Sequence, residues 1–317
     1  MQRQGRVSGP APSSFETSRA PQSGCLTTLV LNANFGRRGG KGGGAMAIVT
    51  ISSELGAGGS EIGAALAKQL EYRYLDREVI AGAANRYGLA EAKLLRLDES
   101  KPSLFDRVDA EGRLYVAGIR AVLLEFAQSN DVVLMGRGGQ WLLRHIPHAL
   151  HVRVSAPFDV RVARLAQQTG GETGRTSPSR AFIDVVRRDD AGRAGRIRYL
   201  YGVDIRDPAL YHLVINTTQV ATSAAVELLV TLARRPEFTP TDIGQRILLD
   251  RKLASLVDVA LAQNPETRKR RITVEATGGV VTLGGIADLY QAEKIARDVP
   301  GVREVKIVQV EPLPGVI

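Results

Sequence analysis

The chain of 317 residues contains one cysteine and no apolar run of the roughly 18 residues that a membrane-spanning helix requires. The single cysteine, Cys25, excludes an intramolecular disulfide framework and favours a reducing, cytoplasmic location. The apolar segment 25–31 is too short and too poorly flanked for a secretory signal. With 44% hydrophobic residues the chain can bury a sizeable core, and its length suits about two domains.

More than half of the net charge of +9 comes from residues 1–45, which carry six Lys or Arg and one acid. This tail is rich in Gly, Ser and Pro, a composition that predicts disorder. Met46 stands directly before the first predicted strand, which raises the hypothesis that translation starts there. Because the rest of the chain is only modestly basic, nucleic acid is the least favoured class of partner.

Residues 47–51 form a short apolar run with β-branched side chains, typical of a strand buried on both faces. Gly56, Gly58 and Gly59 follow, and a helical pattern begins at Ser60. A strand, a glycine-rich turn and a helix N-terminus together make a phosphate-binding loop, because backbone N–H groups and the helix dipole both favour an anion. The alternative is a tight turn that needs glycine only for its geometry.

The loop departs from the full P-loop pattern G-x-x-x-x-G-K-[ST] at two positions. The register aligns Ser53 with the first glycine and Gly59 with the lysine, while Ser60 keeps the hydroxyl that reaches a Mg²⁺ ion. The predicted phosphate-binding residues are Gly56, Ala57, Gly58, Gly59 and Ser60, with Ser60 as the metal contact.

Beyond the loop, strand-like and helical segments alternate along the chain. The strand-like segments are 72–76, 131–135, 150–154 and 211–216, and the helical ones include 77–87, a segment after Pro157 and 223–234. This alternation predicts an α/β fold with a parallel sheet and helices on both faces. Ligands of such sheets bind beyond the carboxyl ends of the strands, where Gly56, Asp76 and Arg137 lie.

Five segments match one family in order and spacing. They are Thr50–Ser52 with the loop Gly56–Gly59, Tyr74–Glu78, Met135–Gly139, Arg187–Asp190 and Tyr211–Thr217. Residues 46–234 thereby resemble the cytidylate kinase-like branch of the P-loop nucleoside monophosphate kinases. The resemblance implies a P-loop kinase-like sheet with a helical lid, ATP and Mg²⁺ as cofactors, and phosphoryl transfer to a nucleoside monophosphate, with a CMP-like acceptor expected first.

The resemblance also implies roles for two residues of the acceptor site. Arg137, in the segment Gly-Arg-Gly-Gly, matches the arginine that holds the acceptor monophosphate, a task that suits a bidentate guanidinium. Asp76 matches a carboxylate at the acceptor site. For Asp76 the alternative is a structural one, as the N-cap of the helix predicted from Arg77.

Four further arginines, Arg161, Arg164, Arg188 and Arg193, flank the glycine-rich stretch 167–175, which is typical of a lid between two helices. The resemblance implies that such arginines close over the donor phosphates, and that Arg164, Arg188 and Arg193 act with Arg137 in catalysis. The alternative for Arg188 is an ordinary surface ion pair with a neighbouring acid on the same helix.

Two departures from the cytidylate kinases bear on activity. Gly59 removes a cation, and loss of one preorganised charge costs on the order of 10²–10³ in rate, unless a lid arginine substitutes. Gly138 stands where cytidylate kinases carry an acid after the arginine, so cytidine specificity does not follow. The alternative function is therefore a noncatalytic nucleotide-binding sensor that has lost kinase activity.

A proline-punctuated linker at 235–242 separates a second predicted domain, 243–311. Its pattern predicts a helix over 243–263, a hairpin of two strands ending at Gly285, a helix over 288–298 and a strand over 302–310. The runs Gly279–Gly285 and Val299–Val305 resemble a BON domain, a small α+β module.

The BON resemblance implies a ligand- or membrane-binding module without catalytic residues, whose ligand is unknown and includes a phospholipid surface among the candidates. The basic run 268–271 is consistent with an acidic partner. The favoured interpretation is a solvated, charged strand edge that resists aggregation.

Overall fold

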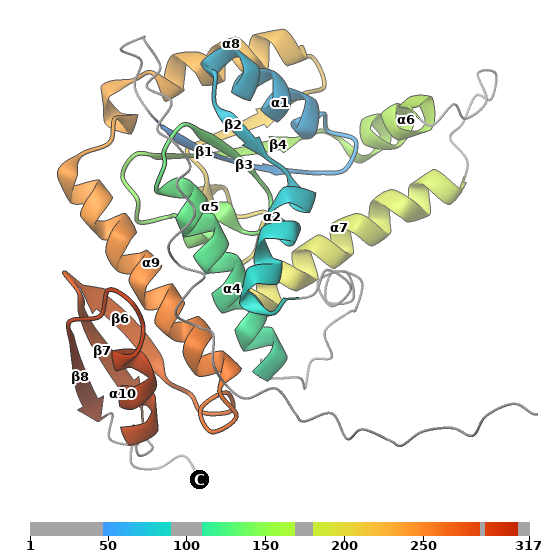
Figure 1. The fold of residues 1–317 in the computed structure, drawn as a ribbon. Helices are drawn as coiled ribbons and strands as arrows, with labels where there is room; N and C mark the ends of the chain where they lie inside the picture. Colours follow the sequence, from blue (N-terminus) through green and yellow to red (C-terminus); the bar gives the residue numbers. More distant parts are fainter. Residues whose placement is uncertain (1–46, 90–109, 169–179, 286–288, 310–317) are drawn as a thin grey trace, which may run out of the picture. The chain divides into compact units, whose positions relative to one another are not determined.

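The computed structural model describes residues 47–89, 110–168, 180–285 and 289–309 (Figure 1). The predicted tail 1–45 and most of the predicted lid stretch 167–175 lie outside these described residues. No helix in the described ranges is both long enough and apolar enough to cross a membrane.

The first sheet has five parallel strands in the order β2-β3-β1-β4-β5 (Figure 1). They are β1 (Ile48–Ser53), β2 (Arg73–Leu75), β3 (Val132–Met135), β4 (Ala149–Ser155) and β5 (Leu213–Asn216). The associated helices are α1 (Gly59–Leu70), α2 (Arg77–Ala84), α4 (Ala110–Ala127), α5 (Gly139–Leu142), α6 (Phe158–Gln168), α7 (Arg180–Tyr201) and α8 (Thr222–Ala233). The predicted α/β architecture is confirmed, and the predicted strands agree within two residues at their ends.

Both faces of this sheet are buried, as the apolar strands predict. Ile48 packs into a cluster with α2, α4 and α5, whereas its neighbour Val49 packs into a second cluster with α1 and α8. Successive residues of a strand point to opposite faces, so a central strand between two layers of helices buries its side chains on both faces, and in β1 Thr50 and Ser52 are buried as well. This arrangement leaves the carboxyl ends of β1 and β3 as the open edge.

The second sheet has three strands, β6 (Thr273–Thr277), β7 (Val280–Gly285) and β8 (Glu304–Gln309). β6 and β7 form the predicted hairpin, and β8 pairs parallel to β7. Val281 and Leu283 of β7 are fully buried against Ala292 and Ala296 of α10 (Tyr290–Arg297). The C-terminal region is thus the small α+β unit that the sequence predicts.

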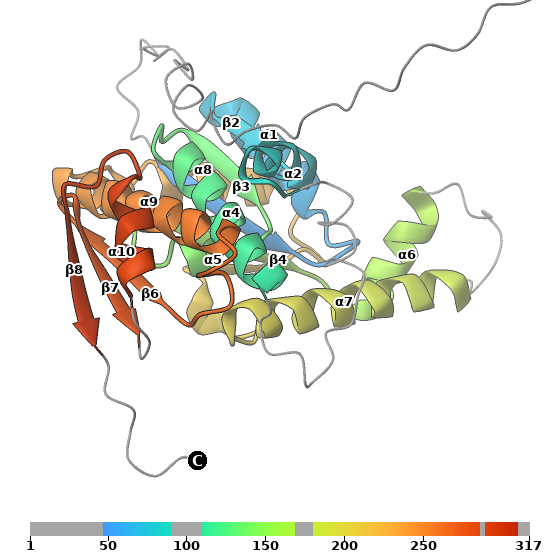
Figure 2. The ribbon, with the colours of Figure 1, turned by 60° about the horizontal axis from the view of Figure 1, so that its bottom comes forward.

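Helix α9 (Asp242–Gln263) contributes to a hydrophobic cluster of the five-stranded sheet and to the core of the three-stranded sheet. It runs alongside α4 (Figures 1 and 2). Its Leu248 is fully buried in the cluster beneath the five-stranded sheet. Val257 and Leu261 are fully buried beneath the three-stranded sheet. Val259 packs against small residues of α4. A single helix therefore packs in the cores of both regions.

Truncation of a side chain on each face of α9 tests this arrangement. We expect Leu248→Ala to lower the free energy of unfolding by about 2–5 kcal/mol, because it leaves a cavity in a packed core. The neighbouring Leu249 is 46% exposed, and Leu249→Ala should change that free energy by less than about 0.5 kcal/mol. Urea denaturation measures both. Equal losses in the two variants would contradict the burial of Leu248.

Candidate functional site

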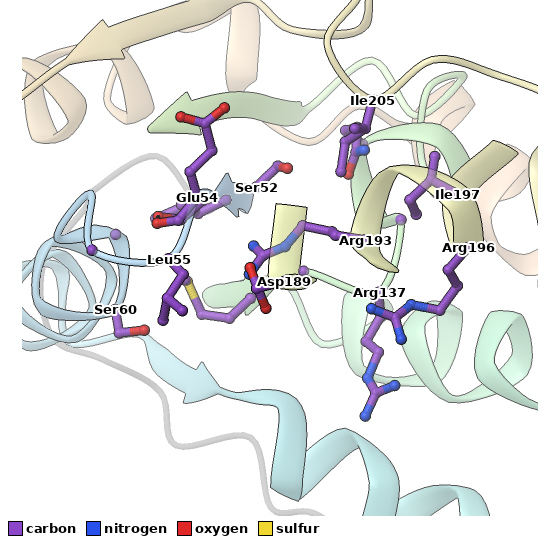
Figure 3. A pocket seen from close by; sticks show the side chains of 18 of the residues that line it. Ser52, Glu54, Leu55, Ser60, Arg137, Asp189, Arg193, Arg196, Ile197 and Ile205 are labelled. Atoms are coloured by element: carbon purple, nitrogen blue, oxygen red, sulfur yellow. Dashed lines mark hydrogen bonds and ion pairs between the residues drawn. The ribbon is translucent and has the colours of Figure 1, made fainter. Parts of the chain in front are cut away.

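A pocket of about 320 Å³ lies beyond the carboxyl ends of β1 and β3 (Figure 3). Its walls are the loop after β1, the loop after β3, one residue of α4 and one face of α7. A ligand site at this edge is expected for a parallel α/β sheet. Gly56, Gly58, Gly59, Ser60 and Arg137 of the predicted site all line it.

The loop after β1 has the backbone geometry of an anion cradle. Gly56 and Gly58 adopt φ angles of 80° and 82°, in the left-handed region that glycine favours. A Cβ on Gly56 would lie 2.6 Å from the carbonyl oxygen of Arg161, so no side chain fits there. Helix α1 begins at Gly59, and its N-terminal N–H groups border the pocket.

The two residues that depart from the P-loop pattern, Ser53 and Gly59, lie next to each other in the structure. A Cβ on Gly59 would collide with the Cβ and Oγ of Ser53. Ser53 occupies the position of the missing first glycine, and Gly59 that of the missing lysine. The side chain of Ser53 therefore fills the space that the stem of a lysine at residue 59 would need. Residues 53 and 59 are therefore packed directly against each other.

A chain of ion pairs fixes the loop to its surroundings. Arg153 of β4 donates to Glu54 at 2.6 Å, and the other carboxylate oxygen of Glu54 lies 3.5 Å from Arg161 of α6. Arg161 in turn makes two hydrogen bonds to Asp190 of α7, at 3.0 and 2.8 Å. Burial alone would lower the pKa of Arg161, but Asp190 and then Glu54 raise it above its ordinary value. Three elements, β4, α6 and α7, are thereby tied to the loop.

Arg137 is held on a strained backbone between two tyrosines. Its φ of 56° is rare for a residue with a side chain, and such strain is concentrated at functional sites. One guanidinium nitrogen donates to the hydroxyl of Tyr115 at 3.1 Å, and the hydroxyl of Tyr201 donates to the carbonyl of Arg137 at 3.2 Å. Burial raises the pKa of Tyr201, so its hydroxyl remains a donor.

The same tyrosine explains the glycine that follows Arg137. Gly138 has φ 74°, and a Cβ there would lie 2.5 Å from the ring of Tyr201. The acid expected at this position from the cytidylate kinases has no room. A ligand at this point of the pocket would therefore meet other side chains.

One face of α7 supplies further charge. Asp189, Arg193, Arg196 and Ile197 line the pocket at helical spacing (Figure 3). Arg193 pairs with Asp189 at 2.7 Å. Arg188 is exposed and is not among the residues that line the pocket.

Sequence reasoning missed Arg196 and the two tyrosines. Arg196 follows Arg193 by three residues and could have been found from helical periodicity. Tyr115 and Tyr201 carry no local motif, because they reach Arg137 from 22 and 64 residues away.

Arg164 lies at a second pocket of about 280 Å³ on the other side of the loop. Its guanidinium donates to the Oγ1 and the carbonyl of Thr217, at 2.8 and 2.6 Å. The Oγ1 of Thr217 donates to the carbonyl of Ala57 at 2.9 Å. Because Gly56 and Gly58 line both pockets, the two cavities adjoin across the glycine-rich loop after β1.

Asp76 accepts a hydrogen bond from the backbone N–H of Val79 at 2.9 Å, which is the N-cap geometry for α2. It is not among the residues that line either pocket. The structure thus shows Asp76 as the N-cap of α2, the alternative that the sequence left open.

The described residues contain no cluster of three His, Cys, Asp or Glu side chains that could hold a metal by itself. Ser60 is exposed at the pocket, while Glu54 and Asp189 are already paired with arginines. This donor set fits an ion such as Mg²⁺, which takes most of its ligands from phosphate and water.

The sequence is similar to known proteins over both regions. A sequence model of the "Cytidylate kinase-like family" matches residues 48–219, more than half of the chain, and one of the "BON domain" matches residues 250–311. A cytidylate kinase of Aeropyrum pernix is 32% identical over 58% of this chain and 98% of its own length. Cytidylate kinases of Sulfolobus acidocaldarius and Pyrococcus horikoshii are 26% and 29% identical, over 59% and 54% of this chain and 94% and 80% of their own lengths.

A double-mutant cycle tests the packing of the loop. We expect Gly59→Ala to lower the free energy of unfolding by about 1–3 kcal/mol, because the added methyl group overpacks against Ser53. Ser53→Gly should remove most of that loss.

Gly82→Ala is the control, because nothing lies within 4 Å of a Cβ in that helical position, and it should be neutral or stabilising by up to about 1 kcal/mol. Additive effects of the substitutions at residues 53 and 59 in urea denaturation would contradict the direct packing of these two residues.

Proposed function

Because the chain belongs to the cytidylate kinase-like family, we propose that it transfers a phosphoryl group from ATP to a nucleoside monophosphate, with CMP as the first candidate acceptor. One observation carries the proposal: the phosphate loop and the arginines Arg137, Arg193 and Arg196 line a single pocket. Phosphoryl transfer needs two nucleotides held in line and cations around the transferred group. The arginines that line this pocket supply the cations.

In this proposal the donor spans the loop. Its phosphates bind the N–H groups between Gly56 and Ser60, and its base enters the second pocket beside Arg164. Both hydrogen bonds to Thr217 hold the guanidinium of Arg164 in place, so its planar face is available for stacking on a base. Arg164 then positions the donor and does not contact the transferred group.

The acceptor monophosphate binds Arg137, whose orientation Tyr115 fixes. An oxygen of the acceptor phosphate attacks the γ-phosphorus of ATP, and ADP leaves as the bond to its β-phosphate oxygen breaks. Arg193 and Arg196 stabilise the charge on the transferred group. They take the role of the P-loop lysine, whose position is occupied by Gly59 in this chain. Asp76 contributes to the acceptor side through the position of α2, whose first turn it caps.

Mg²⁺ would arrive with the triphosphate and be held by the hydroxyl of Ser60. When bound, it neutralises charge on the donor phosphates. We retain Arg188 as a weaker candidate for contact with the donor phosphates, because it shares α7 with Arg193 but is exposed outside the pocket.

A second candidate function is nucleotide binding without turnover. The contact between Ser53 and Gly59 favours it, because it leaves the loop without the cation that P-loop kinases place there. In either case the BON domain would serve as a module that senses a ligand or an acidic membrane surface and reports to the nucleotide site.

Alanine substitutions on α7 distinguish the role proposed for Arg193 from that of Arg188. We expect Arg193→Ala to lower kcat for ATP and the preferred acceptor by on the order of 10²–10³, because a preorganised cation is lost. Arg188→Ala should lower it less than about tenfold, since its side chain lies outside the pocket. A coupled assay for ADP with CMP, UMP, AMP and GMP measures both.

Binding must be measured in the same variants. Retained stabilisation of Arg193→Ala by ATP, seen as a thermal shift, would show that the loss lies in the chemical step. Tight binding of nucleotides by the wild-type protein without any ADP formation would overturn the kinase proposal in favour of the sensor.

A further inference from the structure

Glu61 is an acid in the first turn of α1 that lines both pockets of the nucleotide site. One of its carboxylate oxygens lies 3.7 Å from the place that a Cβ on Gly58 would take, so the carboxylate borders the glycine-rich loop. The other oxygen accepts a hydrogen bond at 3.2 Å from the side-chain amide of Gln168, the last residue of α6. The charge of Glu61 thus stands where the two cavities adjoin.

Glu61 differs from the other two acids that line the larger pocket in its partners. Glu54 is paired with two arginines, and Asp189 is paired with Arg193. Within the part of the chain that the structure describes, Glu61 makes no ion pair, and its hydrogen bond comes from the neutral amide of Gln168. Its negative charge is therefore not balanced by a cation of the described residues.

A carboxylate of this kind opposes the binding of phosphate at the neighbouring loop. Like charges repel, and the repulsion grows where a ligand excludes water from between them. Under the proposed function the phosphates of the donor lie along the loop that Glu61 borders. A divalent cation between the carboxylate and the phosphates reverses the sign of this interaction, because each anion then faces a positive charge.

The oxygen atoms at this side of the pocket suit Mg²⁺. This ion is usually bound by one or two carboxylates and by the phosphates of the substrate, and it keeps several waters. Ser60, the neighbour of Glu61, lies on the loop side of the pocket, across from Arg193 and Arg196 of α7 (Figure 3). The loop has no cation of its own there, because Gly59 stands at the position of the P-loop lysine.

We propose that Glu61 is a ligand of the Mg²⁺ ion that accompanies the donor triphosphate, together with the hydroxyl of Ser60, and that it weakens binding of the triphosphate without the ion. The inference rests on the nucleotide binding in the proposed function, and it holds whether or not phosphoryl transfer follows. Glu61 then makes the site selective for the magnesium complex of the nucleotide.

The alternative role of Glu61 is structural, because an acid in the first turn of a helix interacts favourably with the helix dipole. That role concerns the stability of the empty protein and predicts the same response to Mg²⁺ with and without the carboxylate. The Tm of the ligand-free protein and the affinity for ATP must therefore be measured in the same variants.

Glu61→Gln in the full-length protein tests the proposal, because it removes the charge and keeps the size of the side chain. Calorimetric titration gives the Kd of ATP with excess Mg²⁺ and with EDTA, without an acceptor. With EDTA, Glu61→Gln should bind ATP about three- to tenfold more tightly than the wild type, because a repulsion is removed. The gain in affinity on addition of Mg²⁺ should be about tenfold smaller in the variant, because a ligand of the ion is lost.

Glu71→Gln is the matched control, since Glu71 is an exposed acid at the other end of α1 that lines neither pocket. It should behave as the wild type does. EPR of Mn²⁺ in the complex with ATP is a second readout, and its spectrum should differ between the wild type and Glu61→Gln. An equal gain on addition of Mg²⁺ in the wild type and Glu61→Gln would overturn the role of Glu61 alone. A wild type that binds no ATP in either condition would overturn the proposed function as well.

Discussion

The tight anchoring of the loop after β1 is the constraint on which the site depends. Glu54 lies between Arg153 and Arg161, and Arg161 continues the chain of ion pairs to Asp190. An acid at the mouth of an anion site would repel phosphate if it were not neutralised, so these partners matter for binding as well as for position. The cost of desolvation offsets much of the attraction in such partly buried pairs, so we ascribe to them the position of the loop and not a gain in stability.

The loop after β1 carries no cation of its own, so the positive charges that border the pocket come from other elements. In the usual P-loop, one lysine moves with the loop and reaches the β- and γ-phosphates. Here Ser53 fills the space beside Gly59, and the arginines that border the pocket come from α7 and from the turn after β3. Under the proposed function, catalysis then depends on how α7 is placed, and Asp190 ties that helix to the loop.

Local pattern was sufficient for the five-stranded sheet, for the C-terminal α+β unit and for the position of the glycine-rich loop and Arg137 at one edge of the sheet. Each of these follows from short-range signals, such as apolar runs, glycine spacing and turn residues. Local pattern could not predict contacts between residues that are far apart in the sequence. Tyr115 and Tyr201 meet only in the fold, and the link between Ser53 and Gly59 requires knowledge of packing. Similarly, the periodicity of α9 predicted a helix but not that it is buried in two different cores.

The central claim is that this lysine-free loop still supports phosphoryl transfer. The most direct measurement is ³¹P NMR of the full-length protein with ATP, CMP and Mg²⁺, followed over time. The account predicts that resonances of ADP and CDP grow in equal amounts at the expense of ATP. Resonances of ATP that shift or broaden on addition of protein, with no new phosphate signals for CMP or for the other three monophosphates, would contradict it.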